Sequence, residues 1–123
     1  YRPEKQNINK RLKQGKIQID KKIDFHGLSL LDAETLFLNT IKECYNKKIR
    51  CLLFVTGKGV LKKNLYNNEE IRLYYGKIRH GFKEWTTKIE NQKYILSVEN
   101  APIEYGADGA FLVYLRKLKS HSV

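Results

Sequence analysis

Cysteine is scarce in this chain, which has only two among its 123 residues. Cys44 falls within a helical pattern and Cys51 opens an apolar stretch, so we expect both to be buried, reduced thiols. A disulfide framework needs more cysteines, and the spacing that marks a zinc site is missing. This cysteine usage favours a protein of the cytoplasm over a secreted one.

Long hydrophobic runs are missing as well. No apolar stretch approaches the length of a membrane span or a signal-peptide core, so we expect a soluble protein with no membrane partner. With 123 residues, of which 41% are hydrophobic and 11% aromatic, the chain suits one globular domain and is too short for two ordinary ones. It opens with Tyr1 rather than methionine, which is compatible with a piece of a longer protein.

Acidic residues are too few to balance the basic ones, at 13 against 24, and the formal net charge is +11. The excess lies at the ends of the chain. Residues 1–22 hold eight Lys or Arg and two acids, and the residues from Arg116 onward hold three and none, while residues 23–115 are nearly balanced. We therefore divide the chain into a basic arm (1–22), a domain (23–117) and a short tail (118–123). Basic flanks attract phosphate backbones regardless of sequence; the alternative is a pair of solvated tails that aid solubility.

The segment Ile23–Gly27, a short run of alternating polarity, is where we expect the functional site to form. In a strand, the period of two would turn its two apolar residues to the core and Asp24 and His26 to the other face. A carboxylate beside an imidazole suits proton transfer, because His titrates near neutral pH and Asp can fix its tautomer. The alternative is a sheet surface that happens to carry a polar pair. Gly27 would end the strand in a turn.

A second candidate element follows the apolar run of residues 51–55, which predicts a buried strand. The strand runs into Thr56, Gly57, Lys58 and Gly59. Glycines let backbone N–H groups turn toward an anion and the lysine adds a positive charge, so this loop is a candidate phosphate cradle. The spacing is not that of a Walker A loop, so we expect neither a nucleotide cofactor nor hydrolysis of ATP or GTP. The alternative is a turn that only needs glycine geometry.

The third candidate element is a basic helix face. Residues 60–75 are predicted to form a long polar loop that Gly76 closes. An amphipathic helix follows, with Arg79 in its first turn and Lys83 one turn later. Because a helix N-terminus favours anions, both side chains are candidate phosphate contacts; the alternative is that they are ordinary solvated cations.

The remaining elements complete an α/β fold. Ser29 stands where the N-cap of a first helix is expected, and residues 94–98 and 110–115 predict two further strands separated by a turn that contains Gly106 and Gly109. The order β-α-β-α-β-β predicts a two-layer sandwich in which two helices cover one face of a mixed four-stranded sheet. The other face, with the two candidate catalytic side chains, would be open to a ligand.

Four short motifs in this order resemble those of the Smr domain, the small MutS-related domain, in its stand-alone bacterial form. The matching segments are Ile23–Gly27 for L-D-L-H-G, Thr56–Gly59 for [HT]-G-K-G, Gly76–Arg79 for G-x-L-R and Gly106–Ala110 for G-G-x-G-A. The resemblance covers roughly residues 10–117, and four ordered motifs are more specific than one. Thr56 occupies a position that is often His in the family, and Ala107 replaces the second glycine of the last motif.

The resemblance implies a fold like the C-terminal domain of translation initiation factor three. It also implies either an endonuclease of low sequence specificity, which cleaves RNA or nicks DNA, or a non-catalytic module that binds structured nucleic acid or the ribosome. A divalent cation, Mg or Mn, is a candidate cofactor, and the oligomeric state stays open. RNA carries its own nucleophile in the 2′-hydroxyl, so a single Asp–His pair favours RNA as the substrate.

The residues expected to carry this activity fall into three groups. The catalytic pair is Asp24 and His26. The expected phosphate contacts are Thr56, Gly57, Lys58, Gly59, Arg79 and Lys83. The expected turn residues are Gly27, Gly76, Gly106 and Gly109.

Overall fold

A computed structural model describes residues 18–57, 68–102, 105 and 109–118, with the backbone alone for residues 68–75. It contains four strands, two α-helices and one short 3-10 helix. In chain order these are β1 (Lys21–Asp24), α2 (Leu30–Asn46), β2 (Cys51–Val55), α3 (Asn68–Thr87), η1 (Ile89–Asn91), β3 (Ile95–Asn100) and β4 (Ala110–Leu115).

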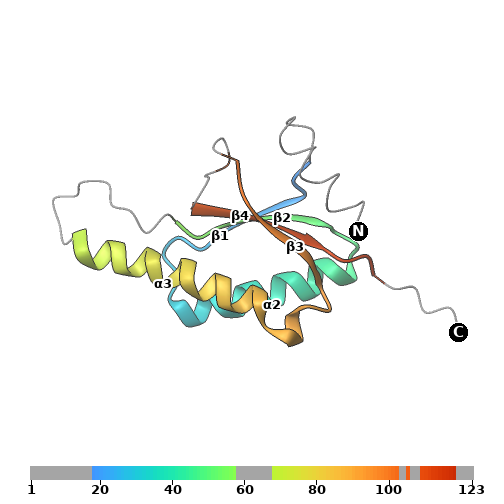
Figure 1. The fold of residues 1–123 in the computed structure, drawn as a ribbon, viewed down its shortest axis with the longest axis horizontal. Coiled ribbons are helices and arrows are strands. Elements are labelled where there is room, and N and C mark those ends of the chain that lie inside the picture. Colours follow the sequence, from blue (N-terminus) through green and yellow to red (C-terminus); the bar gives the residue numbers. More distant parts are fainter. Residues whose placement is uncertain (1–17, 58–67, 103–104, 106–108, 119–123) are drawn as a thin grey trace, which may run out of the picture.

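The four strands form one mixed sheet in the order β1-β2-β4-β3. β1 pairs with β2 in parallel, whereas β4 pairs with both β2 and β3 in antiparallel fashion. Figure 1 shows α2 and α3 side by side on one face of the sheet. The predicted two-layer α/β fold with a mixed four-stranded sheet is confirmed.

Helix α2 begins and ends at the signals that its sequence carries. Ser29 is the N-cap, and its Oγ accepts a hydrogen bond from the backbone N–H of Asp32 at 3.1 Å. At the other end Lys48 adopts a left-handed conformation, with φ +64°, and the backbone N–H of Ile49 donates to the carbonyl of Cys44 at 2.9 Å. This pattern is a Schellman C-cap, a position at which glycine is the usual residue.

An aromatic cluster fills the layer between the helices and the sheet. Its members come from both helices and from three strand ends: Phe25, Phe37, Phe54, Phe82, Trp85 and Phe111, with ring centroids between 4.9 and 6.4 Å apart. All six side chains are buried. Burial and aromatic contacts contribute strongly to the stability of a core. This cluster therefore stabilises the strand ends that carry the candidate site.

The opposite face of the sheet is not open over its inner strands, which corrects the expectation from the sequence. A second buried cluster lies there and consists of Cys51, Leu53, Ala101, Ala110 and Leu112. Strands β2 and β4 are continuous apolar runs, and such runs are typical of strands buried on both faces. Asp24 stays exposed because it lies on the edge strand β1.

Helix α3 begins earlier than the sequence predicts. The expected loop of residues 60–75 is wrong for residues 68–75, which are helical, while residues 60–67 lie outside the described part. Gly76 lies within the helix and forms no turn. The sequence does carry a signal for this earlier start, because Ile71 and Tyr75 continue the helical apolar spacing of Ile78, Phe82 and Trp85 toward the N-terminus.

In the described part of the chain, neither α-helix has the length and apolar character required to span a membrane.

Candidate functional site

Strand β1 ends in a turn that the side chain of Asp24 stabilises. The strand stops at Asp24, and the Oδ1 atom of this residue accepts a hydrogen bond from the backbone N–H of His26 at 2.9 Å. Gly27 then adopts φ +78°, a left-handed conformation that glycine takes without strain, so its predicted turn is confirmed. Asp24 and His26 are both exposed.

The predicted strand over residues 23–26 is therefore wrong at its end, and Asp24 and His26 do not follow each other on one strand face. An Asp side chain competes with the sheet for the N–H two residues on and closes a local turn instead. The hydrogen bond joins the carboxylate of Asp24 to the backbone of His26. The carboxylate thus fixes the point from which the imidazole projects.

Strand β2 ends in a loop that is tied to the start of β4. The backbone N–H groups of Thr56 and Gly57 both donate to the carbonyl of Gly109, at 2.9 and 3.0 Å. Gly57 has φ +86°, the left-handed geometry expected of this loop. Lys58, Gly59 and Gly106 lie outside the described residues.

Thr56 is expected from the sequence to contact a phosphate, but its side chain is buried. Its side chain is 2% exposed, and its hydroxyl donates to the carbonyl of Gly57 at 3.0 Å. In this conformation the hydroxyl faces the protein and has no path to a phosphate. Thr56 contributes to the site by holding the loop in shape, because burial and this hydrogen bond fix its position.

The structure brings these two strand ends together. The backbone N–H of Phe25 donates to the carbonyl of Val55 at 3.0 Å, which extends the pairing of β1 and β2 to the last residues before the turns. Paired strands lie about 4.8 Å apart. β1 and β2 are neighbouring parallel strands, so His26 and Gly57 both follow the carboxyl ends of their strands. They lie at the same end of the sheet, where the chain passes from β1 to α2 (Figure 1).

Arg79 and Lys83 are not at the start of their helix, where the sequence predicts them. Arg79 is in the interior of α3, not in its first turn, because the helix begins at Asn68. Its guanidinium carbon lies 6.0 Å from the ring centroid of Phe111, so this half-buried side chain is beneath the start of β4. Lys83 is exposed one turn later on the same flank of the helix.

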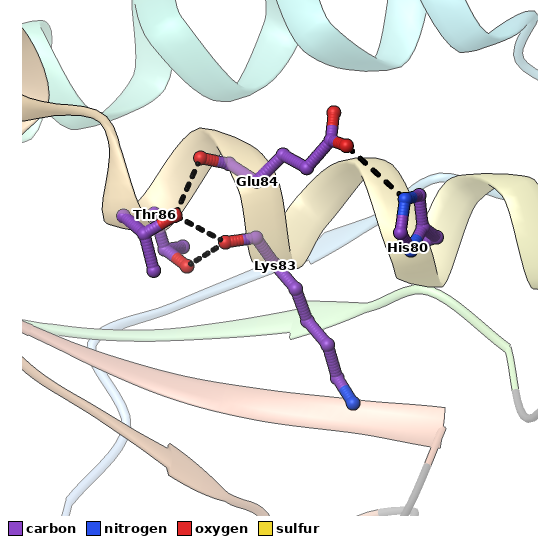
Figure 2. Close-up of polar contacts among 5 residues, drawn as sticks. His80, Lys83, Glu84 and Thr86 are labelled. Atoms are coloured by element: carbon purple, nitrogen blue, oxygen red, sulfur yellow. Dashed lines mark hydrogen bonds and ion pairs between the residues drawn. The ribbon is translucent and has the colours of Figure 1, made fainter.

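Sequence reasoning did not single out His80. Its Nε2 lies 3.1 Å from Oε1 of Glu84, and both side chains are exposed. Figure 2 shows that this pair and the side chain of Lys83 project from different sides of α3. The spacing of four residues on a helix is the signal that predicts such a pair.

The cysteines take no part in this site. Both are free and buried. Burial, followed by the nearby carboxylate of Asp20, raises the pKa of the Cys51 thiol to about 11. Since the thiolate is the reactive form, Cys51 is not a nucleophile near neutral pH.

The described residues do not provide a cage for a divalent cation. In that part of the chain no three His, Cys, Asp or Glu side chains are grouped so that they could hold a metal ion. Asp24 also uses Oδ1 for the turn at His26. Mg²⁺ and Mn²⁺ prefer several oxygen ligands, so no step proposed below passes through a metal.

Comparison with known proteins gives the following likenesses. The family model described as the Smr domain matches residues 23–116. The structure is similar to the crystal structure of the Smr domain of Thermus thermophilus MutS2, with a TM-score of 0.59 and 23% identity over 78% of this chain and 98% of that one. It is also similar to YdaL, a stand-alone small MutS-related protein from Escherichia coli, with a TM-score of 0.58 and 18% identity over 91% of this chain and 76% of that one. None of the curated proteins matches significantly.

Proposed function

The chain belongs to the Smr domain family, and on this premise we propose that it is a nucleic-acid endonuclease of low sequence specificity. The family is known for nucleic-acid binding and nicking endonuclease activity. The basic flanks add sequence-independent attraction to phosphate backbones, which suits a ligand recognised by its charge and shape.

One observation carries the proposal: the turn that the Asp24 carboxylate forms with the backbone of His26. It leaves an exposed imidazole in the turn after β1, beside the strand β2 that leads into Gly57. The N–H groups of Thr56 and Gly57 donate to the carbonyl of Gly109, so a phosphate at this loop would be bound by Lys58 and the backbone after the left-handed Gly57. A proton-transfer group and a candidate phosphate cradle are thus neighbours at one edge of the sheet.

In the proposed reaction, His26 acts as general base toward the 2′-hydroxyl of RNA. The imidazole takes the hydroxyl proton, the 2′-oxygen bonds to phosphorus, the bond from phosphorus to the 5′-oxygen breaks, and the departing oxygen takes a proton from water. The carboxylate of Asp24 holds the turn from which the imidazole projects. Lys58 and Arg79 would stabilise the charge that grows on the phosphate oxygens.

A second candidate function is binding of nucleic acid without cleavage. The turn at Asp24 supports it, because the carboxylate already has a structural role there. Oδ1 of Asp24 is engaged by a backbone N–H, which is a structural role that needs no catalysis. Thr56, at the position that is often His in the family, supplies no second imidazole. In this case the site would recognise structured nucleic acid or the ribosome.

The cellular location that fits either function is the cytoplasm. Two free, buried cysteines support a reducing compartment. RNA or DNA is the proposed partner in both cases.

The two functions are separated by one assay. The purified protein is incubated with labelled structured RNA, single-stranded RNA and supercoiled DNA, each with magnesium, manganese or a chelator. An endonuclease cleaves at least one of these, and we expect structured RNA to be cleaved in the presence of chelator. Binding to the same substrates without cleavage under any condition would reject the endonuclease and leave the binding module.

A further inference from the structure

The end of the sheet opposite the candidate site is strongly basic. β1 and β2 begin there and β4 ends there, because β4 runs antiparallel to both (Figure 1). The two basic flanks of the sequence therefore enter and leave the sheet at the same end. The residues that carry positive charge around it are Lys21, Lys22, Lys47, Lys48, Arg50, Lys93, Arg116 and Lys117. This group is called the basic end below.

The carboxylates at the basic end are engaged within the protein. Oδ2 of Asp20 accepts a hydrogen bond from the backbone N–H of Cys51 at 3.0 Å. Oε1 of Glu43 lies 2.9 Å from Nζ of Lys47, and this hydrogen bond, the charge of Lys47 and then the charge of Lys21 hold the pKa of Glu43 below its usual value. Glu43 and Lys47 offset each other, and the remaining lysines and arginines outnumber Asp20, so this end keeps a net positive charge.

Lys48 is the most informative residue of the basic end. Among the residues that the structure describes, it is the only non-glycine with a positive φ, at +64°. It follows the C-cap residue Lys47 of α2, at the left-handed position where glycine is the usual residue, and its side chain is exposed. A lysine held in an unfavourable backbone conformation, in the middle of a basic surface, points to a role for its side chain.

Aromatic rings are interleaved with these charges. Nζ of Lys93 lies 5.2 Å from the ring centroid of Tyr94, and the rings of Tyr94 and Tyr45 are 5.1 Å apart. The guanidinium carbon of Arg50 lies 4.5 Å from the ring centroid of Tyr114. All three tyrosines are partly buried, and basic groups beside aromatic faces are typical of surfaces that bind nucleic acids.

We propose that the basic end binds the phosphate backbone of the same nucleic acid whose other part lies at His26 and Gly57. This inference rests on the proposed function for the class of ligand. Strand β2 separates the two ends by five residues. At about 3.3 Å per residue this is roughly 15 Å, which corresponds to about four or five base pairs of a duplex. The protein therefore contacts one strand twice and prefers substrates long enough to reach both ends.

The test compares two double variants with the same loss of charge. Lys48→Gly with Lys93→Gln removes two lysines from the basic end, and Lys77→Gln with Lys88→Gln removes two exposed lysines from α3 and the segment after it. Binding to labelled RNA and DNA hairpins is measured by fluorescence anisotropy over a range of salt concentrations. The stems are about 12 base pairs long in one set and about two in the other, which is shorter than the roughly four or five base pairs between the two contacts.

On the long stem, the basic-end variant should lose about 0.9 per lost phosphate contact from the slope of log K against log salt, and the control should keep the parent slope. On the short stem the two variants should not differ. Equal slopes for the two variants on the long stem would overturn the proposal. If the parent binds no nucleic acid, this inference and the proposed function both fall. If the basic-end variant loses slope and the parent cleaves nothing, only the endonuclease is rejected.

Discussion

The carboxylate of Asp24 accepts a hydrogen bond from the backbone N–H of His26, and the two atoms are 2.9 Å apart. This bond sets the geometry of the turn at the end of β1. It also separates two roles of Asp24 that mutation can distinguish, because Asn keeps an acceptor oxygen but loses the charge.

Replacing Asp24 tests the turn directly. Asp24→Asn should leave the free energy of unfolding nearly unchanged, whereas Asp24→Ala should lower it by about 0.5–1.5 kcal/mol, the usual contribution of one hydrogen bond. Urea denaturation measures both values. If Asn and Ala are equally destabilising, the charge and not the hydrogen bond holds the turn.

Replacing Lys48 should raise the free energy of unfolding, whereas Asp24→Ala should lower it. Lys48→Gly should raise the free energy of unfolding by about 0.5–1 kcal/mol, because glycine adopts φ +64° without the strain of a side chain. The control is Lys47→Gly, which should destabilise the protein, because Lys47 has φ −87° and pairs with Glu43. A loss of stability in Lys48→Gly would show that its side chain supports the fold.

Two glycines within α3 should respond oppositely to alanine. A Cβ at Gly76 would meet nothing within 4 Å, so Gly76→Ala should stabilise the helix by up to about 1 kcal/mol. A Cβ at Gly81 would lie 3.0 Å from Cδ1 of Leu30 and 3.0 Å from Cζ2 of Trp85. Trp85 is packed in the aromatic cluster and cannot move freely, so Gly81→Ala should lower the melting temperature. The same sign for both variants would contradict the packing of α3 on α2.

The raised pKa of Cys51 predicts how stability depends on alkaline pH. Its pKa is about 11 in the folded protein, against an ordinary value of 9.0, so folding favours the neutral thiol. The unfolded chain loses this proton first, and its contribution to stability should disappear as the pH rises from about 9 to 11. Cys51→Val removes the titration. Urea denaturation of the two proteins at several pH values should show the parent losing more stability than the variant over this range, and parallel curves would contradict the prediction.

The sequence predicts the elements that have a clear apolar pattern. Residues 110–115 form β4 as expected, and helix α2 begins after Ser29 and ends near residues 46–48. The first turns of α3 are predicted as a loop because polar residues are frequent there and Gly76 suggests a break, although Ile71, Tyr75 and Ile78 have helical apolar spacing. The position of Arg79 depends on this start, so it was misplaced as well.

The candidate site is predictable only where a residue acts through its own backbone. Gly27 and Gly57 adopt the left-handed geometry that their places in the motifs suggest. The hydroxyl of Thr56 also donates to the carbonyl of Gly109, just before β4 and 53 positions later in the chain, and no local sequence pattern predicts such a contact. The bond of Asp24 to the backbone of His26 likewise appears only in the folded turn.

The central claim is that His26 moves a proton at the scissile phosphate, and it is tested by cleavage of labelled structured RNA by His26→Ala beside His80→Ala. His80 is the matched control, because it is also exposed and its pairing with Glu84 is a surface ion pair of small energetic weight. We expect His26→Ala to reduce the cleavage rate by about 10²–10⁴-fold with binding retained, and His80→Ala to cleave at the parent rate. Cleavage at the parent rate by His26→Ala would contradict the claim.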